Sequence, residues 1–295
     1  MSLFSINTAE PTSSSHLSIR IYGLLAAAFC AASLSWVAPS HAQSIEELKA
    51  KGASIAIAPE PPLMTIDENG VPGGLGPEMD RAILDEIGIT AVTGQVMEYG
   101  AIIPSVQSRR VTMGTSAALY VRPERCRAVN FSEPMSCSQE AFILPTSLVD
   151  KVKSYKDVAE QGLRIGVCGG CSEQKLATDA GVDASKITVF PDGVSGYKLL
   201  ADNRIDVFAH DSVTATGVQR RVGDGKTAVV IAEGTAVSCA AAAFNKDDKE
   251  LLDAYNKARL NLFKSGKYME ILKKYDLEAV SVADLDVTTE KLCNP

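Results

Sequence analysis

The chain has 295 residues, and its 36 Asp and Glu against 29 Lys and Arg give a formal net charge of −7. An acidic chain without a basic run lacks the electrostatic signature of nucleic-acid binding, so we expect no nucleic-acid partner. The length suits one large domain or two of ordinary size, and we expect a monomer.

The N-terminal residues 1–42 are predicted to be a secretory signal peptide with a polar prefix. Residues 21–37 are apolar or small and uncharged, and Ser40 and Ala42 fit the small-x-small cleavage pattern. A membrane anchor is the alternative, but small residues interrupt the stretch and no Lys/Arg cluster follows it. We therefore expect a mature chain that begins near Gln43 in the periplasm.

The first half of the mature chain alternates short apolar runs with amphipathic stretches. The 77–87 segment places Met79 and Ile83 on one face of a helix. We expect strands at 54–58, 89–96 and 113–119, and helices at 77–87 and 102–108. This strand–helix alternation predicts a mostly parallel sheet covered by helices, which is an α/β fold.

The same alternation then restarts, without any repeat of short period. We expect strands at 163–167, 187–190 and 205–209, and helices at 172–180, 194–201 and from Ser212 onward. Two blocks of similar size indicate two lobes and not a solenoid.

Two strand-like segments, 140–144 and 237–244, are predicted to cross between the blocks. The helices expected at 247–264 and 268–275 lack strands of their own, so the chain should return to the first lobe. We therefore predict a two-segment hinge with a ligand cleft between the lobes. Lobe 1 would comprise 43–140 and 238–295, and lobe 2 would comprise 141–237.

The mature chain keeps six cysteines, and an exported protein folds in an oxidising compartment, so disulfides are expected. Six cysteines allow 15 pairings, and the sequence does not choose among them. Cys137 and Cys239 lie in or beside the crossing segments, so we predict that they are neighbours. The six are Cys126, Cys137, Cys168, Cys171, Cys239 and Cys293.

Catalytic and metal motifs are scarce in the mature chain. His210 is its one histidine, and there is no His-Glu-x-x-His, Gly-x-Ser-x-Gly or Walker loop. Asp211 is expected to point away from His210 at the strand end, which disfavours a Ser-His-Asp triad. We predict no catalytic residue, no metal site and no cofactor.

Cys168-Gly-Gly-Cys171 follows a predicted strand and opens a predicted helix. This position is typical of thiol oxidoreductases, because a helix N-terminus lowers the pKa of a thiol. A structural disulfide or a ligand loop is the preferred interpretation, since the rest of a thioredoxin unit is missing. Gly169, Gly170 and Ser172 are therefore candidate ligand residues. The two glycines let a ligand approach the backbone closely, and the helix that begins at Ser172 presents free N–H groups to it.

Candidate ligand residues of lobe 1 lie at strand ends. Arg125 is placed to hold a carboxylate with two parallel hydrogen bonds, although a surface salt bridge with Glu124 is an equal alternative. Tyr99 and Tyr120 are placed to stack on a ligand or to enclose a cation. Ala118, at the end of the same strand as Tyr120, completes this set.

Two acids are placed for a cationic group. Glu60 ends the first strand, in a turn stiffened by Pro59, Pro61 and Pro62. Asp211 ends a strand of lobe 2 and either pairs with a ligand ammonium or caps the helix that follows. The sequence leaves both interpretations of Asp211 open.

Residues 120–134 carry a Tyr-Val-Arg-Pro-Glu-Arg block and a Phe-Ser-Glu-Pro block. Together they resemble the signature of family 3 extracellular solute-binding proteins, as do residues 69–80 and 203–211. The resemblance spans about residues 54–275. Residues 98–104 and the Pro-Glu-Arg-Cys block look most similar to the ectoine/hydroxyectoine-binding subgroup.

The resemblance implies a type II periplasmic-binding-protein fold that closes on its ligand and delivers it to an ABC transporter permease in the inner membrane. It implies that Arg125 grips a carboxylate, that Asp211 takes an α-ammonium, and that Tyr99 and Tyr120 stack on the solute. The expected solute is an amino acid or an amino-acid-like zwitterion, such as ectoine or a related compatible solute.

Departures at Pro61-Pro62 and in the Gly-Gly-Cys-Ser loop leave the identity of this solute open. We expect a binding protein and not an enzyme. One alternative on the same scaffold is a cyclohexadienyl-type dehydratase with Glu60 or Glu173 as the general acid. The other is a thiol oxidoreductase that uses Cys168 and Cys171.

Overall fold

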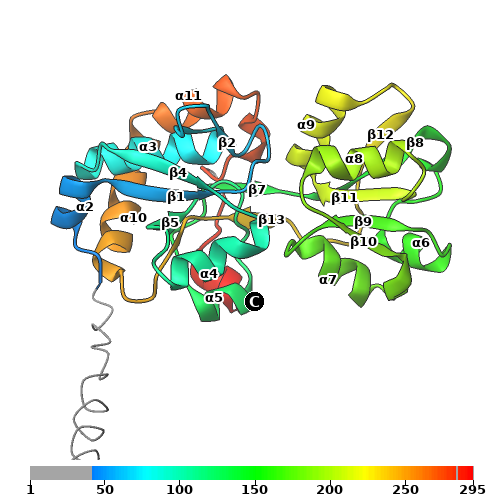
Figure 1. Ribbon diagram of the computed structural model, residues 1–295, viewed down its shortest axis with the longest axis horizontal. Helices are drawn as coiled ribbons and strands as arrows, with labels where there is room; N and C mark the ends of the chain where they lie inside the picture. The colour runs from blue at the N-terminus through cyan, green and yellow to red at the C-terminus, as the bar shows by residue number, and fades with distance from the viewer. Residues whose placement is uncertain (1–41, 284, 295) are drawn as a thin grey trace, which may run out of the picture. The chain divides into compact units, whose positions relative to one another are not determined.

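The structure is a computed structural model that describes residues 42–283 and 285–294. These residues form two α/β lobes, each built on a five-stranded sheet with helices packed against it (Figure 1). This arrangement confirms the predicted fold class. The predicted signal peptide lies outside the described residues, apart from Ala42. None of the helices in the described part of the chain has the length and apolar character needed to span a membrane.

The sheet of lobe 1 has the strand order β4-β1-β5-β14-β6. β1 pairs in parallel with β4 and β5, and β14 pairs antiparallel with β5 and β6. Apolar side chains of β1, including Ile55 and Ile57, are completely buried beneath the helices. The strands are β1 (Ala53–Ile57), β4 (Val92–Val96), β5 (Met113–Gly114), β6 (Asn130–Phe131) and β14 (Ala243–Phe244), with a small hairpin of β2 (Thr65–Ile66) and β3 (Pro72–Gly73) beside them.

The expected strand at 113–119 is wrong beyond Gly114, where β5 ends. The Thr115 hydroxyl and the Ser116 backbone N–H donate to the Asp80 carboxylate, so these residues leave the ladder. The helices of lobe 1 before the crossing are α2 (Ile45–Lys51), α3 (Leu75–Ile87), α4 (Ile102–Gln107) and α5 (Pro123–Ala128), with a 3₁₀ turn η1 (Tyr99–Ala101).

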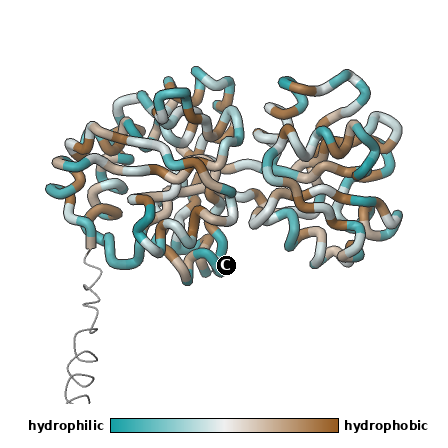
Figure 2. Tube along the Cα trace, viewed as in Figure 1, coloured by the Kyte–Doolittle hydropathy of each residue, from teal (hydrophilic) through white to brown (hydrophobic). Residues whose placement is uncertain are grey.

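The sheet of lobe 2 has the order β10-β9-β11-β8-β12. β10, β9 and β11 pair in parallel, and β8 pairs antiparallel with both β11 and β12. The strands of both sheets are largely apolar (Figure 2). The elements are β8 (Glu140–Pro145), η2 (Thr146–Leu148), α6 (Tyr155–Glu160), β9 (Ile165–Cys168), α7 (Ser172–Asp179), η3 (Ala184–Lys186), β10 (Ile187–Phe190), α8 (Gly193–Ala201), β11 (Val207–Asp211), α9 (Ser212–Val222) and β12 (Thr227–Ile231).

Two short antiparallel strands, β7 (Ser136–Ser138) and β13 (Ser238–Ala240), carry the chain between the lobes (Figure 1). Cys137 lies opposite Cys239, and a disulfide joins them with their Cα atoms 4.0 Å apart. The expectation that 140–144 crosses between the lobes is wrong, because this run is β8, between β11 and β12 of lobe 2. A short apolar run looks the same in a crossing segment and in a buried strand.

The C-terminal segment packs on lobe 1. It comprises α10 (Lys249–Lys264), α11 (Lys267–Lys274), η4 (Glu278–Val280) and α12 (Thr289–Cys293). Tyr255 of α10 donates a 2.6 Å hydrogen bond to Asp80 of α3, and burial raises the pKa of that carboxyl to about 6. A second disulfide, Cys126–Cys293, ties α12 to α5.

Candidate functional site

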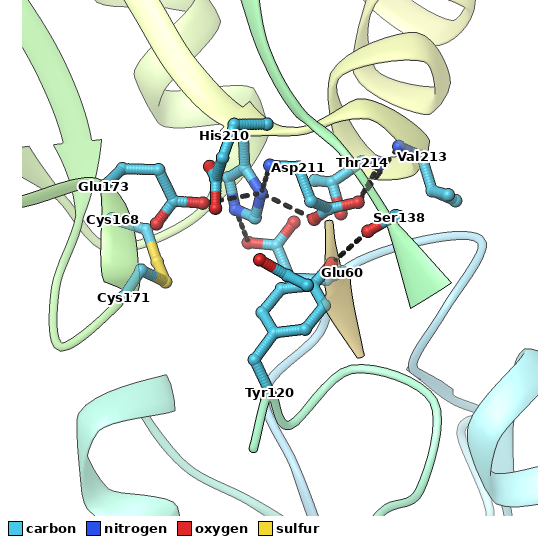
Figure 3. Close-up of polar contacts among 12 residues, drawn as sticks. Glu60, Tyr120, Ser138, Cys168, Cys171, Glu173, His210, Asp211, Val213 and Thr214 are labelled. Atoms are coloured by element: carbon cyan, nitrogen blue, oxygen red, sulfur yellow. Dashed lines mark hydrogen bonds and ion pairs between the residues drawn. A yellow bond between two sulfur atoms is a disulfide. The ribbon is translucent and has the colours of Figure 1, made fainter. Parts of the chain in front are cut away.

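An acidic cluster lies where the lobes face each other. We use this name for Glu60, Glu140, Glu173 and Asp211, which are buried together around the equally buried His210. Glu60 follows β1 of lobe 1, whereas Glu173 and Asp211 belong to α7 and β11 of lobe 2 (Figure 3). Glu140 is the first residue of β8 in lobe 2. Strand ends and a helix N-terminus thus bring four carboxyl groups from distant parts of the sequence to one place.

His210 stands at the centre of the acidic cluster. Its Nδ1 lies 2.8 Å from Oδ2 of Asp211, and its Nε2 lies 3.8 Å from Oε1 of Glu60. Burial lowers the pKa of the imidazole, but the charge of Glu60 and the contact with Asp211 outweigh it and hold that pKa well above its usual range. The expectation that Asp211 points away from His210 is therefore wrong. The side chains meet because His210 turns its ring back toward its own backbone, with Nδ1 2.9 Å from the backbone nitrogen of Asp211.

Asp211 begins α9 as its N-cap. Oδ1 accepts hydrogen bonds from the backbone N–H groups of Val213 (2.9 Å) and Thr214 (3.0 Å). Burial acts to raise the pKa of Asp211, but the hydrogen bond and the charge of His210 lower it below its usual range. The structure thus confirms Asp211 as a helix cap, and its role toward a ligand ammonium stays a prediction.

Glu140 and Glu173 lack sufficient hydrogen-bond partners. Both carboxylate oxygens of Glu140 and the Oε2 of Glu173 are buried without a hydrogen bond among the described residues. Burial, reinforced by the charges of Glu173 and Asp211, raises the pKa of Glu140 to about 9, although Arg122 lies 3.8 Å away and opposes the shift. Burial also raises the pKa of Glu173. A cation bound beside these two buried groups would favour their charged forms.

Arg125 bridges the lobes. Its Nη1 donates to the carbonyl oxygen of Tyr120 (2.9 Å) and to the hydroxyl of Tyr99 (3.2 Å), and its Nη2 donates to the carbonyl oxygen of Gly170 (3.0 Å). The guanidinium also lies over the Tyr99 ring, 5.4 Å from its centroid. No ion pair joins Arg125 to Glu124 in the described part of the chain, and the surface salt bridge does not form.

The two tyrosines are anchored by their hydroxyl groups. Tyr99 donates to the carbonyl oxygen of Ala118 (3.0 Å), and Tyr120 shares a 2.6 Å hydrogen bond with Ser138 of β7. Both rings therefore keep a defined position beside the acidic cluster.

The loop between β9 and α7 approaches lobe 1 very closely. Gly170 has a φ of +80°, and a Cβ added to it would lie 2.7 Å from the Cα of Gly100. A disulfide between Cys168 and Cys171 closes this loop. Ser172 follows as the first residue of α7, with its Oγ buried and without a partner among the described residues.

The predicted ligand residues divide between two cavities. A small cavity of about 20 Å³ lies inside the acidic cluster, and it shares the lining residues Glu60, Tyr99 and Cys168 with a wider cavity of about 740 Å³. The small cavity is lined by Glu60, Tyr99, Ala118, Tyr120 and Asp211, together with Leu63, Met64, Cys168, Cys171, Glu173, His210 and Thr214. A cavity of about 20 Å³ holds about one water molecule. A solute can therefore enter this cavity only if the lobes move apart.

Most of the remaining predicted residues line another cavity. Arg125, Gly170 and Ser172 line a cavity of about 370 Å³ that also contains Arg122 and Glu140. Gly169 lines none of these three cavities.

Several residues of this site are not predicted as ligand residues by the sequence. Glu173 is expected there only as a general acid, and His210 only as part of a triad. Glu140 is missed, and Arg122 enters only as part of the Arg-Pro-Glu-Arg run in which Arg125 is the predicted ligand residue. The one sequence signal for Glu140 is that this acid begins an otherwise apolar strand. Such a strand is expected to be buried, and a buried charge normally needs a partner, so an acid in this position points to a site.

The comparisons with known proteins agree with this architecture. Residues 53–278 match the family described as bacterial extracellular solute-binding proteins, family 3. A relative from Sinorhizobium fredii (strain NBRC 101917 / NGR234), described as the probable amino-acid ABC transporter periplasmic-binding protein y4tE, is 31% identical over 262 residues. That match covers 86% of this chain and 87% of the relative.

Solved structures show the same similarity. EhuB in complex with hydroxyectoine shares 39% sequence identity at a TM-score of 0.79, covering 85% of this chain and 97% of its own. An ancestral arginine-binding protein bound to arginine shares 27% identity at a TM-score of 0.67, covering 76% and 97%. The family match extends over both lobes and the crossing strands, and the chain therefore belongs to the bacterial extracellular solute-binding proteins of family 3.

Proposed function

We propose that this protein captures a small zwitterion with a cationic group in the periplasm and delivers it to an ABC transporter permease in the inner membrane. The observation that carries the proposal is the acidic cluster, in which Glu60 of lobe 1 faces Glu173 and Asp211 of lobe 2 beside two tyrosines. Buried carboxylates need a cationic partner, and aromatic faces also attract cations.

A ligand at this place touches both lobes. Glu60, Tyr99 and Tyr120 reach it from lobe 1, whereas Glu173 and Asp211 reach it from lobe 2. Neither half of the site is complete alone, so solute binding stabilises the closed arrangement. A carboxylate on the same solute would take the guanidinium hydrogen bonds that Arg125 now makes to Gly170 and Tyr120.

The relatives support this class of solute. Hydroxyectoine and arginine, named for the two solved structures above, each combine a carboxylate with a delocalised cation. We therefore place ectoine, hydroxyectoine and basic amino acids first among the candidates. A cleaved signal peptide and a monomeric state belong to the same proposal.

Calorimetry and thermal-shift measurements on the exported protein test this function. The solutes are ectoine, hydroxyectoine, arginine, glutamine and glycine betaine. We expect at least one cationic zwitterion to raise the unfolding temperature by mass action. Glu60→Gln should weaken its binding about tenfold or more, because one charged hydrogen bond contributes about 1.5–3 kcal/mol.

Glu68→Gln is the matched control, because Glu68 is an exposed glutamate of the same lobe. Equal affinity of Glu60→Gln and the unmodified protein would refute the cation site, as would binding of anionic solutes alone.

One observation favours the dehydratase alternative. Glu173 is buried in the cleft with a raised pKa, as a general acid requires. Incubation with a cyclohexadienyl acid decides between the two functions. Turnover that Glu173→Gln abolishes supports an enzyme, and tight binding without turnover supports the transport function.

A further inference from the structure

Two cysteines and the histidine of the mature chain converge on one point of the cleft wall. The Sγ atoms of Cys168 and Cys171 and one ring nitrogen of His210 all lie within 4.8 Å of one another. Cys168 ends β9, Cys171 immediately precedes α7, and His210 lies in β11, which pairs in parallel with β9. The carboxyl ends of neighbouring parallel strands thus bring the three side chains together.

The environment of His210 provides an independent observation. Asp211 holds Nδ1 at 2.8 Å, which leaves Nε2 as the ring nitrogen for a ligand. Nε2 of His210 and Oε2 of Glu173 are buried without a hydrogen bond among the described residues. The nearest acid to Nε2 is Glu60, whose Oε1 lies 3.8 Å away (Figure 3). Metal-ligating histidines typically have their second nitrogen bound to a carboxylate in this way.

We propose that Cys168, Cys171 and His210 form a redox-gated Zn²⁺ site once the Cys168–Cys171 disulfide is reduced. Two thiolates and an imidazole are a donor set that zinc prefers, and tetrahedral coordination leaves a fourth position. That position faces the small cavity, where Glu173 or the carboxylate of a solute can occupy it. Zn–S bonds of about 2.3 Å place tetrahedral ligand atoms roughly 3.5 Å apart, so only small shifts of the side chains are needed.

The chemistry balances with a dithiol as the reductant. The dithiol gives two electrons and two protons to the disulfide and becomes a disulfide itself, leaving two thiols in the protein. Zn²⁺ then displaces one proton from each thiol as the two Zn–S bonds form. The N-terminus of α7 assists this step, because it stabilises a thiolate at Cys171.

Cobalt substitution tests the site on the whole exported protein, reduced with a phosphine under anaerobic conditions and freed of reductant. One equivalent of Co²⁺ should give thiolate-to-cobalt charge-transfer absorption and tetrahedral d–d bands, and Zn²⁺ should abolish both. X-ray absorption of the zinc form should show two sulfur atoms and at least one nitrogen in the first shell. The oxidised protein should give neither band.

Cys168→Ser/Cys171→Ser is the matched variant, because it keeps the other four cysteines under the same reduction. We expect it to lose the bands, and we expect His210→Asn to weaken Zn²⁺ binding at least tenfold. Bands that persist in the double serine variant would overturn the proposal. A first shell without nitrogen in the unmodified protein would also overturn it, and this measurement does not require His210→Asn to fold.

Discussion

Nη2 of Arg125 in lobe 1 donates a 3.0 Å hydrogen bond to the carbonyl oxygen of Gly170 in lobe 2. The same guanidinium binds the carbonyl oxygen of Tyr120, so it presents its donors to neutral acceptors at the junction of the lobes. A solute carboxylate is a stronger acceptor than either carbonyl. This relationship makes Arg125 the group whose change should affect solute binding most directly.

Arg125→Ala is expected to weaken the binding of a carboxylate-bearing solute about 10- to 150-fold, since a lost charged hydrogen bond costs about 1.5–3 kcal/mol. Calorimetry with the best solute of the screen measures this change. Arg127→Ala is the control, because Arg127 is an exposed arginine on the same helix. A change within about twofold for Arg125→Ala would contradict the carboxylate assignment.

Gly170→Ala is expected to hinder closure of the cleft. The new Cβ would lie 2.7 Å from the Cα of Gly100, and the φ of +80° would strain the backbone as well. Solute affinity should fall, and small-angle scattering should show less compaction at saturating solute.

Gly181→Ala separates the two effects of Gly170→Ala. Gly181 has a φ of +89°, but beyond its chain neighbours a Cβ added to it would meet no other atom of the described residues within 4 Å. Both variants should lose roughly 1–2 kcal/mol of unfolding free energy, because alanine is strained in the left-handed backbone conformation that glycine adopts there. Only Gly170→Ala should lose solute affinity, and an equal loss in both variants would exclude the contact with Gly100 as its cause.

The disulfide between the crossing strands should contribute more to stability than the Cys168–Cys171 disulfide. Cys137 and Cys239 are 102 residues apart in sequence, whereas Cys168 and Cys171 are separated by 3. A disulfide stabilises the fold by reducing the entropy of the unfolded chain. This effect amounts to about 4.7 kcal/mol for a loop of roughly 100 residues and is smaller for a short loop. Urea unfolding should therefore show a greater loss for Cys137→Ala/Cys239→Ala than for Cys168→Ala/Cys171→Ala, and the reverse order would contradict this expectation.

Glu140 should make stability depend on pH. Its pKa is raised to about 9 in the folded protein from an ordinary value of 4.5. Between these values the folded state holds a proton that the unfolded state has lost. Unfolding free energy should therefore fall as pH rises through this window, by at most about 1.4 kcal/mol per pH unit from this one group.

Glu140→Gln should reduce this pH dependence, since glutamine resembles the protonated acid and does not titrate. Denaturant unfolding at pH 6 to pH 9 (roughly the window in which the slope applies) measures the difference. Glu160→Gln, at an exposed glutamate of α6, removes the same charge and should keep the slope of the unmodified protein. An unchanged slope in Glu140→Gln would show that Glu140 does not hold this proton.

Part of the site could be predicted because strand ends converge in open α/β sheets. Glu60, Tyr120 and Asp211 were placed by this rule, and they line one small cavity. Glu140 and His210 could not be placed in the same way. A sequence shows that a residue carries a charge, but it does not show that neighbouring strands will bury that charge.

The alternation of strands and helices in this chain already defined two α/β lobes, because hydrophobic period and turn residues act locally along the sequence. The Pro-Glu-Arg and Phe-Ser-x-Pro blocks indicated the protein family. The pairing of Cys126 with Cys293, the contact of Gly170 with Gly100 and the acidic cluster around His210 were decided only in the folded chain. Each of these joins residues far apart in sequence, and their distance depends on how whole elements pack and not on any local pattern.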